Sequence, residues 1–196
     1  MVTTTETMDP VDYSHHSQIL WQISDHALTE AGGAISELTQ CETRIDLQSL
    51  GMIDVHDAVG LFDESEPDMI AVSQALSGVI NGHGIFVVNE SSSMAWLRQL
   101  LNEKARLREL TRMEEESLGE LGNIMLNSCL GNYLDMLKGL VTSQLPQLNR
   151  GHYTQLLHGF FNDIGDEDIF YVNIKIHSGD ISCPAYILWT GLSWDD

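Results

Sequence analysis

The sequence predicts an α+β fold in which two pseudo-symmetric halves form a mostly antiparallel sheet covered by long helices. Three observations support this class. The predicted segments follow the order helix, strands, helix, and then helix and strands again. Short turns separate the neighbouring strands, as is typical of antiparallel pairs. A short stretch of the first long helix recurs in the second, which indicates a duplicated half.

The first half opens with a helix that leads into strand-like sequence. Apolar residues at helical spacing predict a helix over residues 16–38. Strand-like sequence follows over residues 42–62, and we expect Gly51 and Gly60 to break it. Residues 63–68 are acidic and contain proline, which predicts a surface loop.

Two strands and a helix complete this half. The strands are predicted over residues 69–76 and 79–88, and Gly82 and Gly84 in the second favour a bulge or a sharp bend. The three serines at 91–93 are N-cap candidates for a helix that continues to Leu101.

The second half begins with a helical pattern over residues 107–140, and Pro146 would stop any continuation. Three further elements close the chain: a helix over 153–161 that ends near 162–165, and strands over 169–177 and 181–189 around a turn at 178–180.

The domain organisation follows from the repeat. Residues 27–33 align with residues 117–123 and share Leu, Glu and Gly in register. We therefore expect residues 1–14 to be a disordered lead-in and residues 15–196 to be a single domain, with halves at 15–105 and 106–190. The lead-in is polar and acidic, unlike a signal peptide, so we expect a cytoplasmic protein.

Charge and composition exclude several functions. Nine basic and 29 acidic residues give a formal net charge of −20, which repels nucleic acid and anionic lipid and favours a partner with a basic face. The charge could also serve only solubility or a salty cytoplasm. No run of apolar residues is long enough to span a bilayer. We expect neither nucleic acid nor a membrane as partner.

The cysteines and histidines do not form an obvious site. Cys41, Cys129 and Cys183 are odd in number and far apart, so a disulfide framework is not expected. The pair His15–His16 has no carboxylate or cysteine at ligand spacing beside it. We therefore expect no metal site.

Four polar residues share one face of the long helix in the second half. At about 100° per residue, Glu116, Glu120, Asn123 and Asn127 fall in one narrow stripe. Apolar residues occupy the opposite side of the helix: Leu118, Leu121 and Met125. The helix therefore buries one face and presents a carboxylate and an amide together on the other.

These two groups suit the hydrolysis of an acyl phosphate. An amide can orient a water in line with phosphorus, and a carboxylate one turn away can pair with a lysine of the partner. A Glu and an Asn three residues apart also arise by chance in roughly one chain in two of this length. Such a pair on an exposed helix is usually an ordinary solvated face, so the pair alone does not establish a function.

The sequence around the pair resembles a known family. Residues 116–124 resemble the phosphatase segment of the CheC, CheX and FliY family. In that family Asp or Ser is followed after three residues by Glu, after two more by Asn, and after twenty-two more by Pro. Glu120, Asn123 and Pro146 match this pattern, whereas Glu116 stands where the family has Asp or Ser. The chance of that proline match is roughly one in twenty.

The resemblance covers most of residues 18–189 and implies a CheC-like fold of two related halves. The first half keeps Glu30, but Gly33 stands where the amide belongs and His56 where the proline belongs. It therefore resembles a degenerate site, and we expect the second half to hold the only active one.

The resemblance implies a phosphatase that dephosphorylates the phosphoaspartate of a CheY-type response regulator, in chemotaxis or related two-component signalling. Glu120 is then the recognition carboxylate and Asn123 the water-orienting amide, with Glu116, Asn127 and Pro146 in auxiliary roles. No cofactor of its own is implied, because the partner regulator supplies Mg²⁺.

Other functions stay open. Relatives of this fold in the flagellar switch bind partners without catalysis, and some family members regulate a CheD-like deamidase by binding it. An acidic adaptor with a fortuitous motif is a third alternative, and the sequence leaves a homodimer open.

Overall fold

The computed structural model describes residues 10–62, 68–101, 111–137, 139–161 and 168–192. Its elements are, in chain order, α1 (Pro10–Thr39), β1 (Thr43–Asp54), the short 3-10 helix η1 (Ala58–Leu61), β2 (Asp68–Gly78), β3 (Gly82–Asn89), α2 (Glu90–Leu100), α3 (Arg112–Leu137), β4 (Val141–Ser143), β5 (Gln147–His152), α4 (Tyr153–Phe161), β6 (Asp168–Ser178) and β7 (Ile181–Trp189).

The seven strands form one antiparallel sheet. The order is β1-β6-β7-β3-β2-β4, and β5 also pairs with β2. Strands β4 and β5 therefore share one edge of the sheet and are separated only by residues 144–146. The expected α+β class with a mostly antiparallel sheet is confirmed.

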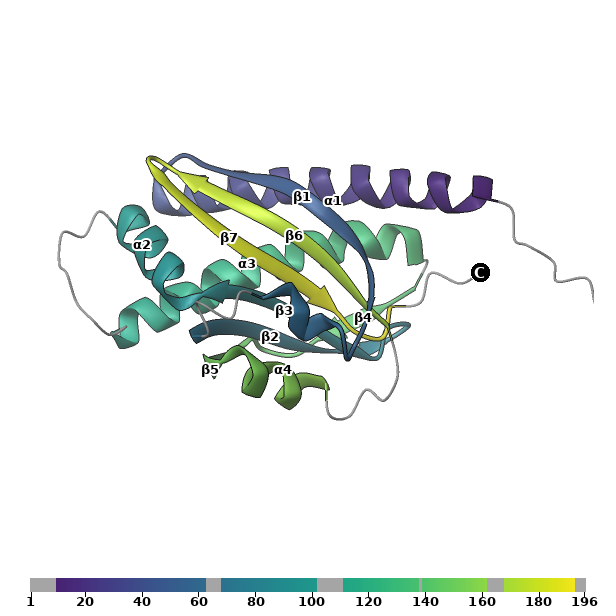
Figure 1. Ribbon diagram of the computed structural model, residues 1–196. Coiled ribbons are helices and arrows are strands. Elements are labelled where there is room, and N and C mark those ends of the chain that lie inside the picture. The colour runs from purple at the N-terminus through teal and green to yellow at the C-terminus, as the bar shows by residue number, and fades with distance from the viewer. Residues whose placement is uncertain (1–9, 63–67, 102–110, 138, 162–167, 193–196) are drawn as a thin grey trace, which may run out of the picture.

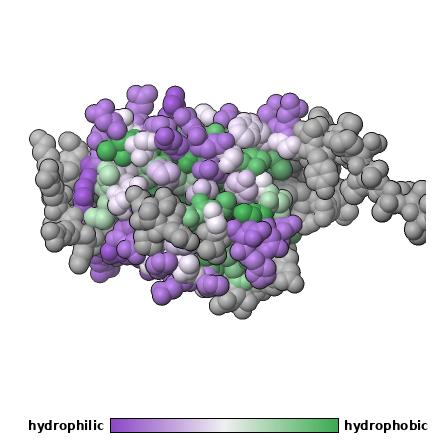
Figure 2. Space-filling view, in the orientation of Figure 1, coloured by the Kyte–Doolittle hydropathy of each residue, from purple (hydrophilic) through white to green (hydrophobic). Residues whose placement is uncertain are grey.

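Two apolar cores lie on the two faces of the sheet. The larger is built from α1, α2 and α3 and includes Leu28, Trp96 and Met125. The smaller lies under α4 and includes Leu157 and Phe161. Figure 1 shows the long helices α1 and α3 side by side along the sheet, as their mutual contacts also indicate. Hydrophilic residues cover most of the coloured surface in Figure 2, with small hydrophobic patches between them.

Several expected elements match the structure closely. Helix α4 has the predicted bounds, and strands β2, β6 and β7 differ from the predicted ones by at most two residues at either end. Helix α3 runs within the predicted 107–140, of which 107–110 and 138 lie outside the described residues. Of the expected loop at 63–68, residues 63–67 also lie outside them, and Asp68 is the first residue of β2 instead. The expected helix end at 162–165 lies outside them as well.

Helix α1 starts earlier than expected. It begins at Pro10, so the prediction of a disordered lead-in does not hold for residues 10–14. Proline is favourable in the first turn of a helix because its missing N–H has no intrahelical partner there.

The glycines in the strands do not break them. Strand β1 continues through Gly51, and its register shifts between Leu47 and Ser49 instead. The pairing of β2 with β3 is continuous through Gly84 and Gly82, so the expected bulge is wrong. A Cβ on Gly84 would lie 2.4 Å from the ring of Trp189, so glycine serves close packing at this position.

The N-cap of α2 is Asn89 rather than one of the three serines. Its side-chain oxygen accepts a hydrogen bond of 3.1 Å from the backbone N–H of Ser92. Asparagine caps a helix as well as serine does, and Asn89 ends the preceding strand directly.

Helix α3 does not reach Pro146, so the proline is not what ends it. Helix α3 ends at Leu137, and β4 follows before Pro146 is reached. The proline lies in the connection between β4 and β5, where its missing N–H costs no ladder hydrogen bond.

Candidate functional site on helix α3

Gly122 allows α3 to approach β2 closely. A Cβ at this position would lie 2.6 Å from the Cβ of Val72, which no real pair of side chains tolerates. Side chains alternate along a strand, so Gln74 faces the same helix as Val72. Asn123 follows Gly122 directly, and the close approach brings its amide to Gln74.

A small amide network fixes Asn123. The Nε2 group of Gln74 donates to Oδ1 of Asn123 at 2.6 Å, and Nδ2 of Asn127 donates to the same oxygen at 2.9 Å. A carbonyl oxygen has two lone pairs, so both are used. Nδ2 of Asn123 has no hydrogen-bond partner among the described residues and is left to meet a ligand.

Gln74 holds this network from inside the core. Its side chain is 2% exposed, and its Oε1 is buried without a hydrogen-bond partner in the described part of the chain. An unsatisfied buried acceptor costs about 1–3 kcal/mol. Such groups are uncommon in folded proteins and call for an explanation. The hydrogen bond to Asn123 offers such an explanation, because the buried side chain of Gln74 provides a rigid donor for Oδ1 of Asn123.

The two carboxylates of the stripe differ in their surroundings. Glu120 is exposed one turn before Asn123 and has no ion-pair or hydrogen-bond partner among the described residues. Glu116 accepts from Nε of Arg112 at 2.9 Å, and both side chains are mostly exposed. Such a surface pair is worth about 0–1 kcal/mol and exchanges readily. Glu120 is therefore the carboxylate that a partner's cation can reach without competition.

Pro146 lies apart from the amide network. It is half-buried in the connection between β4 and β5, which is tied to β2 by the N–H of Gln144 donating to the carbonyl of Ala75 at 2.9 Å. Helix α3 contacts both β2 and β5. The structure thus brings together Asn123, Asn127 and Gln74, whereas Glu116, Glu120 and Pro146 stand outside their hydrogen bonds.

The corresponding positions of the first half are occupied differently. Glu30 on α1 accepts a hydrogen bond of 2.9 Å from Nδ2 of Asn132 on α3. Gly33 is exposed, and no atom of another element lies within 4 Å of the Cβ that it lacks. His56 is exposed in the turn after β1. No amide from position 33 stands beside Glu30, and the prediction of a silent first half stays a prediction.

The buried thiol and phenol groups on α3 are uncharged at neutral pH. Burial raises the pKa of the Cys129 thiol to about 12. Burial also raises the pKa of Tyr133, Cys129 raises it further, and the hydrogen bond with Ser24 opposes the shift. Within the ranges given above, no three His, Cys, Asp or Glu side chains are grouped so that they could hold a metal ion. In the same ranges, no helix is long and apolar enough to cross a bilayer.

Gln74 is the member of the site that sequence reasoning missed. It stands in the run Ile70–Leu76 among buried apolar residues, at a position that faces the helices. A lone glutamine at an inward-facing strand position is a signal that could have found it.

Comparison with solved structures identifies the fold of the chain. FliY of Thermotoga maritima aligns over 97% of this chain and 92% of its own with a TM-score of 0.71 and 14% identity. The FliM middle domain of H. pylori aligns over 90% of this chain and 92% of its own with a TM-score of 0.64 and 13% identity.

A complex of CheX with CheY, BeF₃ and Mg²⁺ from Borrelia burgdorferi aligns over 83% of this chain and 94% of its own. Its TM-score is 0.51 and its identity 15%. No family model and no curated protein matches the sequence itself. The chain has the fold of the CheC/CheX/FliY family, which it shares with the FliM middle domain.

Proposed function

We propose that this protein hydrolyses the phosphoaspartate of a CheY-type response regulator, with Asn123 orienting the attacking water and Glu120 contacting the regulator. One observation carries the proposal. The amide of Asn123 is held from behind by the buried Gln74 on an accessible helix face, one turn from an unpaired carboxylate.

The chemistry needs little more than a positioned water. Its oxygen bonds to phosphorus while the bond from phosphorus to the aspartyl oxygen breaks, and the electron pair of that bond stays on the carboxylate. Both protons of the water remain with the product, which leaves as dihydrogen phosphate, so the step needs no further acid or base. The protein lowers the barrier by holding the water in line, so a fixed amide contributes more than a mobile one.

The network indicates where the water binds. Both lone pairs of Asn123 Oδ1 are used, one by Gln74 and one by Asn127. Asn127 is exposed, so a water can replace its donor at this oxygen, while the buried Gln74 keeps the other lone pair. Oδ1 of Asn123 then accepts a hydrogen bond from the water, and Nδ2 can donate one to a phosphoryl oxygen or to a second water.

Glu120 serves recognition in this scheme. An exposed carboxylate can form a charge-assisted hydrogen bond with a lysine or arginine of the regulator and fix the register of docking. The groups on this face that could bind a metal ion are one unpaired carboxylate and two amides, which do not form the set of oxygen ligands that Mg²⁺ prefers. We therefore assign the Mg²⁺ to the regulator and no catalytic step to a metal held by this chain.

The comparisons support a CheY-type partner, because one neighbour was crystallised with CheY. A regulator of this kind would place the protein in the cytoplasm. Binding of a CheD-like deamidase and formation of a homodimer stay predictions that no observation tests.

A second candidate is a binding module without catalysis. The structures of FliY and of the FliM middle domain align with higher TM-scores than CheX does, and an H. pylori structure holds FliM together with FliG. A switch-type adaptor would use the same helix face or the sheet edge to hold its partner.

Two measurements on one preparation separate these candidates. Binding of a phosphorylated CheY-type regulator from the same organism is measured by calorimetry, and phosphate release is followed with a phosphate sensor. The phosphatase predicts both binding and accelerated release. Binding without acceleration would favour the adaptor, and absence of both for every regulator of that organism would overturn the phosphatase and any adaptor that acts on a regulator.

A further inference from the structure

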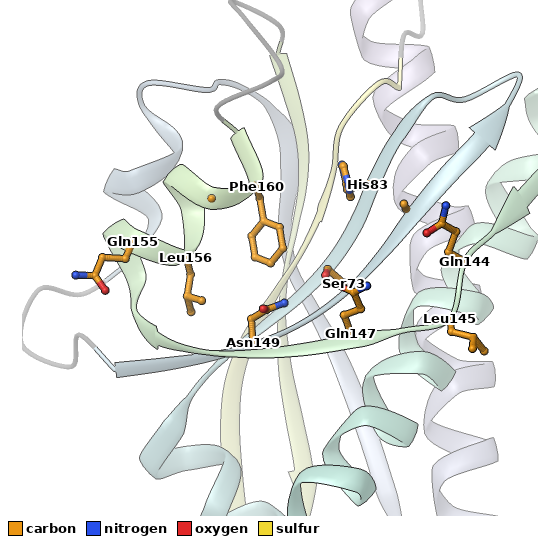
Figure 3. Close-up of a pocket in the computed structure, with 11 residues that line it drawn as sticks. Ser73, His83, Gln144, Leu145, Gln147, Asn149, Gln155, Leu156 and Phe160 are labelled. Atoms are coloured by element: carbon orange, nitrogen blue, oxygen red, sulfur yellow. The ribbon is translucent and has the colours of Figure 1, made fainter.

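A cavity lies on the face of the sheet that points away from α3. It has a volume of about 480 Å³, is open to solvent on one side, and is lined by residues of β2, β3, the β4–β5 edge and α4 (Figure 3). Small-molecule sites in proteins occupy about 300–1,000 Å³. The cavity is therefore large enough for a molecule of the size of a sugar or a nucleoside.

Polar side chains from two paired strands form its floor. Ser73 of β2 is the register partner of Gln147 of β5, and Asn149 lies two residues further along the same face of β5. Figure 3 shows Phe160 pointing from α4 toward these three side chains. The cavity thus combines a polar floor with one aromatic wall.

The hydrogen-bonding groups of this floor are unused. Ser73 is 6% exposed, yet its hydroxyl has no hydrogen-bond partner among the described residues. In the same part of the chain, the carboxamides of Gln144, Gln147 and Asn149 also have none. The Ser73 oxygen is not sealed in the interior but faces this pocket, so a hydroxyl of a bound ligand can reach it and form the hydrogen bond that the protein leaves open.

The lining sets the chemistry of that ligand. It contains no Asp, Glu, Lys or Arg, although the chain carries a formal net charge of −20, and the ionisable side chain in it is the imidazole of His83. A charged ligand would meet no carboxylate, ammonium or guanidinium group of this lining to pair with. Each carboxamide and each hydroxyl offers both a donor and an acceptor, which is also true of every hydroxyl of a sugar.

We propose that this cavity binds an uncharged polyhydroxylated small molecule, whose hydroxyls meet Ser73, Gln147 and Asn149 and whose apolar face packs on Phe160. A cyclic sugar fits the aromatic wall better than a linear polyol, because a ring presents a flat apolar face. The site shares β2 with the Asn123 stripe but lies on the other side of the sheet, so it does not depend on the proposed phosphatase activity.

Saturation-transfer NMR on the full chain tests the proposal. The probes are neutral monosaccharides and linear polyols at millimolar concentration, each beside a charged analogue, a uronate or an amino sugar, with nucleosides as a separate arm. Two variants alter the cavity. Gly159→Leu fills it, because Gly159 lines the cavity and no atom lies within 4 Å of the Cβ that it lacks. Ser73→Ala removes only the buried hydroxyl.

Gly131→Leu is the matched control, since Gly131 is an exposed glycine of α3 with equally open space around it. We expect at least one neutral sugar to bind the parent and Gly131→Leu equally. Its affinity should fall by at least about tenfold in Gly159→Leu and measurably in Ser73→Ala, while all three variants keep a cooperative unfolding transition.

Three results would overturn the proposal. One is that no neutral sugar or polyol binds the folded parent. Another is that binding survives unchanged in both folded cavity variants. The third is that only charged analogues or nucleosides bind.

Discussion

The buried side-chain amide of Gln74 donates a hydrogen bond of 2.6 Å to Oδ1 of Asn123, linking the interior of the sheet to the exposed face of α3. The residue proposed to orient water is thereby positioned by a core residue with no access to the partner. This separation of roles allows positioning and chemistry to be tested at different residues.

Replacing Gln74 should reduce catalysis without weakening the fold. We expect Gln74→Leu to lower kcat for phosphate release by about tenfold, because Asn123 loses the donor that fixes its orientation. The variant also removes the unpartnered Oε1, so the melting temperature should not fall. Steady-state kinetics and thermal unfolding of the same samples check both expectations.

Asn127→Ala is the matched control for this variant. It removes the other donor to Oδ1, which the proposed water replaces, so kcat should stay the same or rise. A loss of activity in Asn127→Ala equal to that in Gln74→Leu would contradict the distinction between the two donors.

Gly122→Ala should destabilise the protein although alanine favours helices. The added methyl would lie 2.6 Å from the Cβ of Val72, and overpacking of this kind costs about 1–3 kcal/mol. Gly131→Ala on the same helix meets no atom within 4 Å and should raise the free energy of unfolding by up to about 1 kcal/mol. Urea unfolding compares the two, and equal effects would show that α3 does not press on β2 at Gly122.

Neutralising Glu120 should weaken partner binding and leave the chemical step intact. For Glu120→Gln we expect KM to rise by about threefold to tenfold with kcat nearly unchanged, and the dependence of KM on salt to become weaker. Glu116→Gln should have a smaller effect, because Glu116 already pairs with Arg112. A drop in kcat in Glu120→Gln at unchanged KM would place this carboxylate in the chemistry instead.

The stability of the protein should fall at alkaline pH. Burial raises the pKa of both Cys129 and Cys183 from 9.0 to about 12. Between these values the unfolded chain has lost the two protons that the native state keeps, so the free energy of unfolding falls as the pH rises from about 9 to about 12. Urea unfolding across this range should show a shallower slope in Cys129→Ala, and an unchanged slope would contradict the assignment.

The periodicity of the sequence was sufficient for much of the fold. Helix α4 and strands β6 and β7 could be predicted because their apolar spacing and the turn at Gly179 are local features. The polar stripe on α3 was predictable for the same reason. Strands β4 and β5 were not predicted, because β4 is three residues long and β5 is polar. They form only through pairing with β2, which lies more than sixty positions earlier in the chain.

The positioning of Asn123 depended on contacts that no local pattern contains. Its hydrogen bond with Gln74 joins residues 49 positions apart. The bond also requires glycine at position 122, because a Cβ there would clash with Val72 and hold α3 away from β2. Sequence motif and spacing thus predicted the candidate amide, whereas the residue that holds it became visible only in the packed structure.

The most direct test of the central claim is the rate constant of phosphate release from a phosphorylated CheY-type regulator that is fully bound, in single-turnover experiments with the parent and with Asn123→Ala. At saturation this rate constant is independent of affinity. The account predicts acceleration by the parent and a loss of about 100-fold in Asn123→Ala, with the dissociation constant unchanged. Equal rate constants for the two proteins would contradict the role of Asn123.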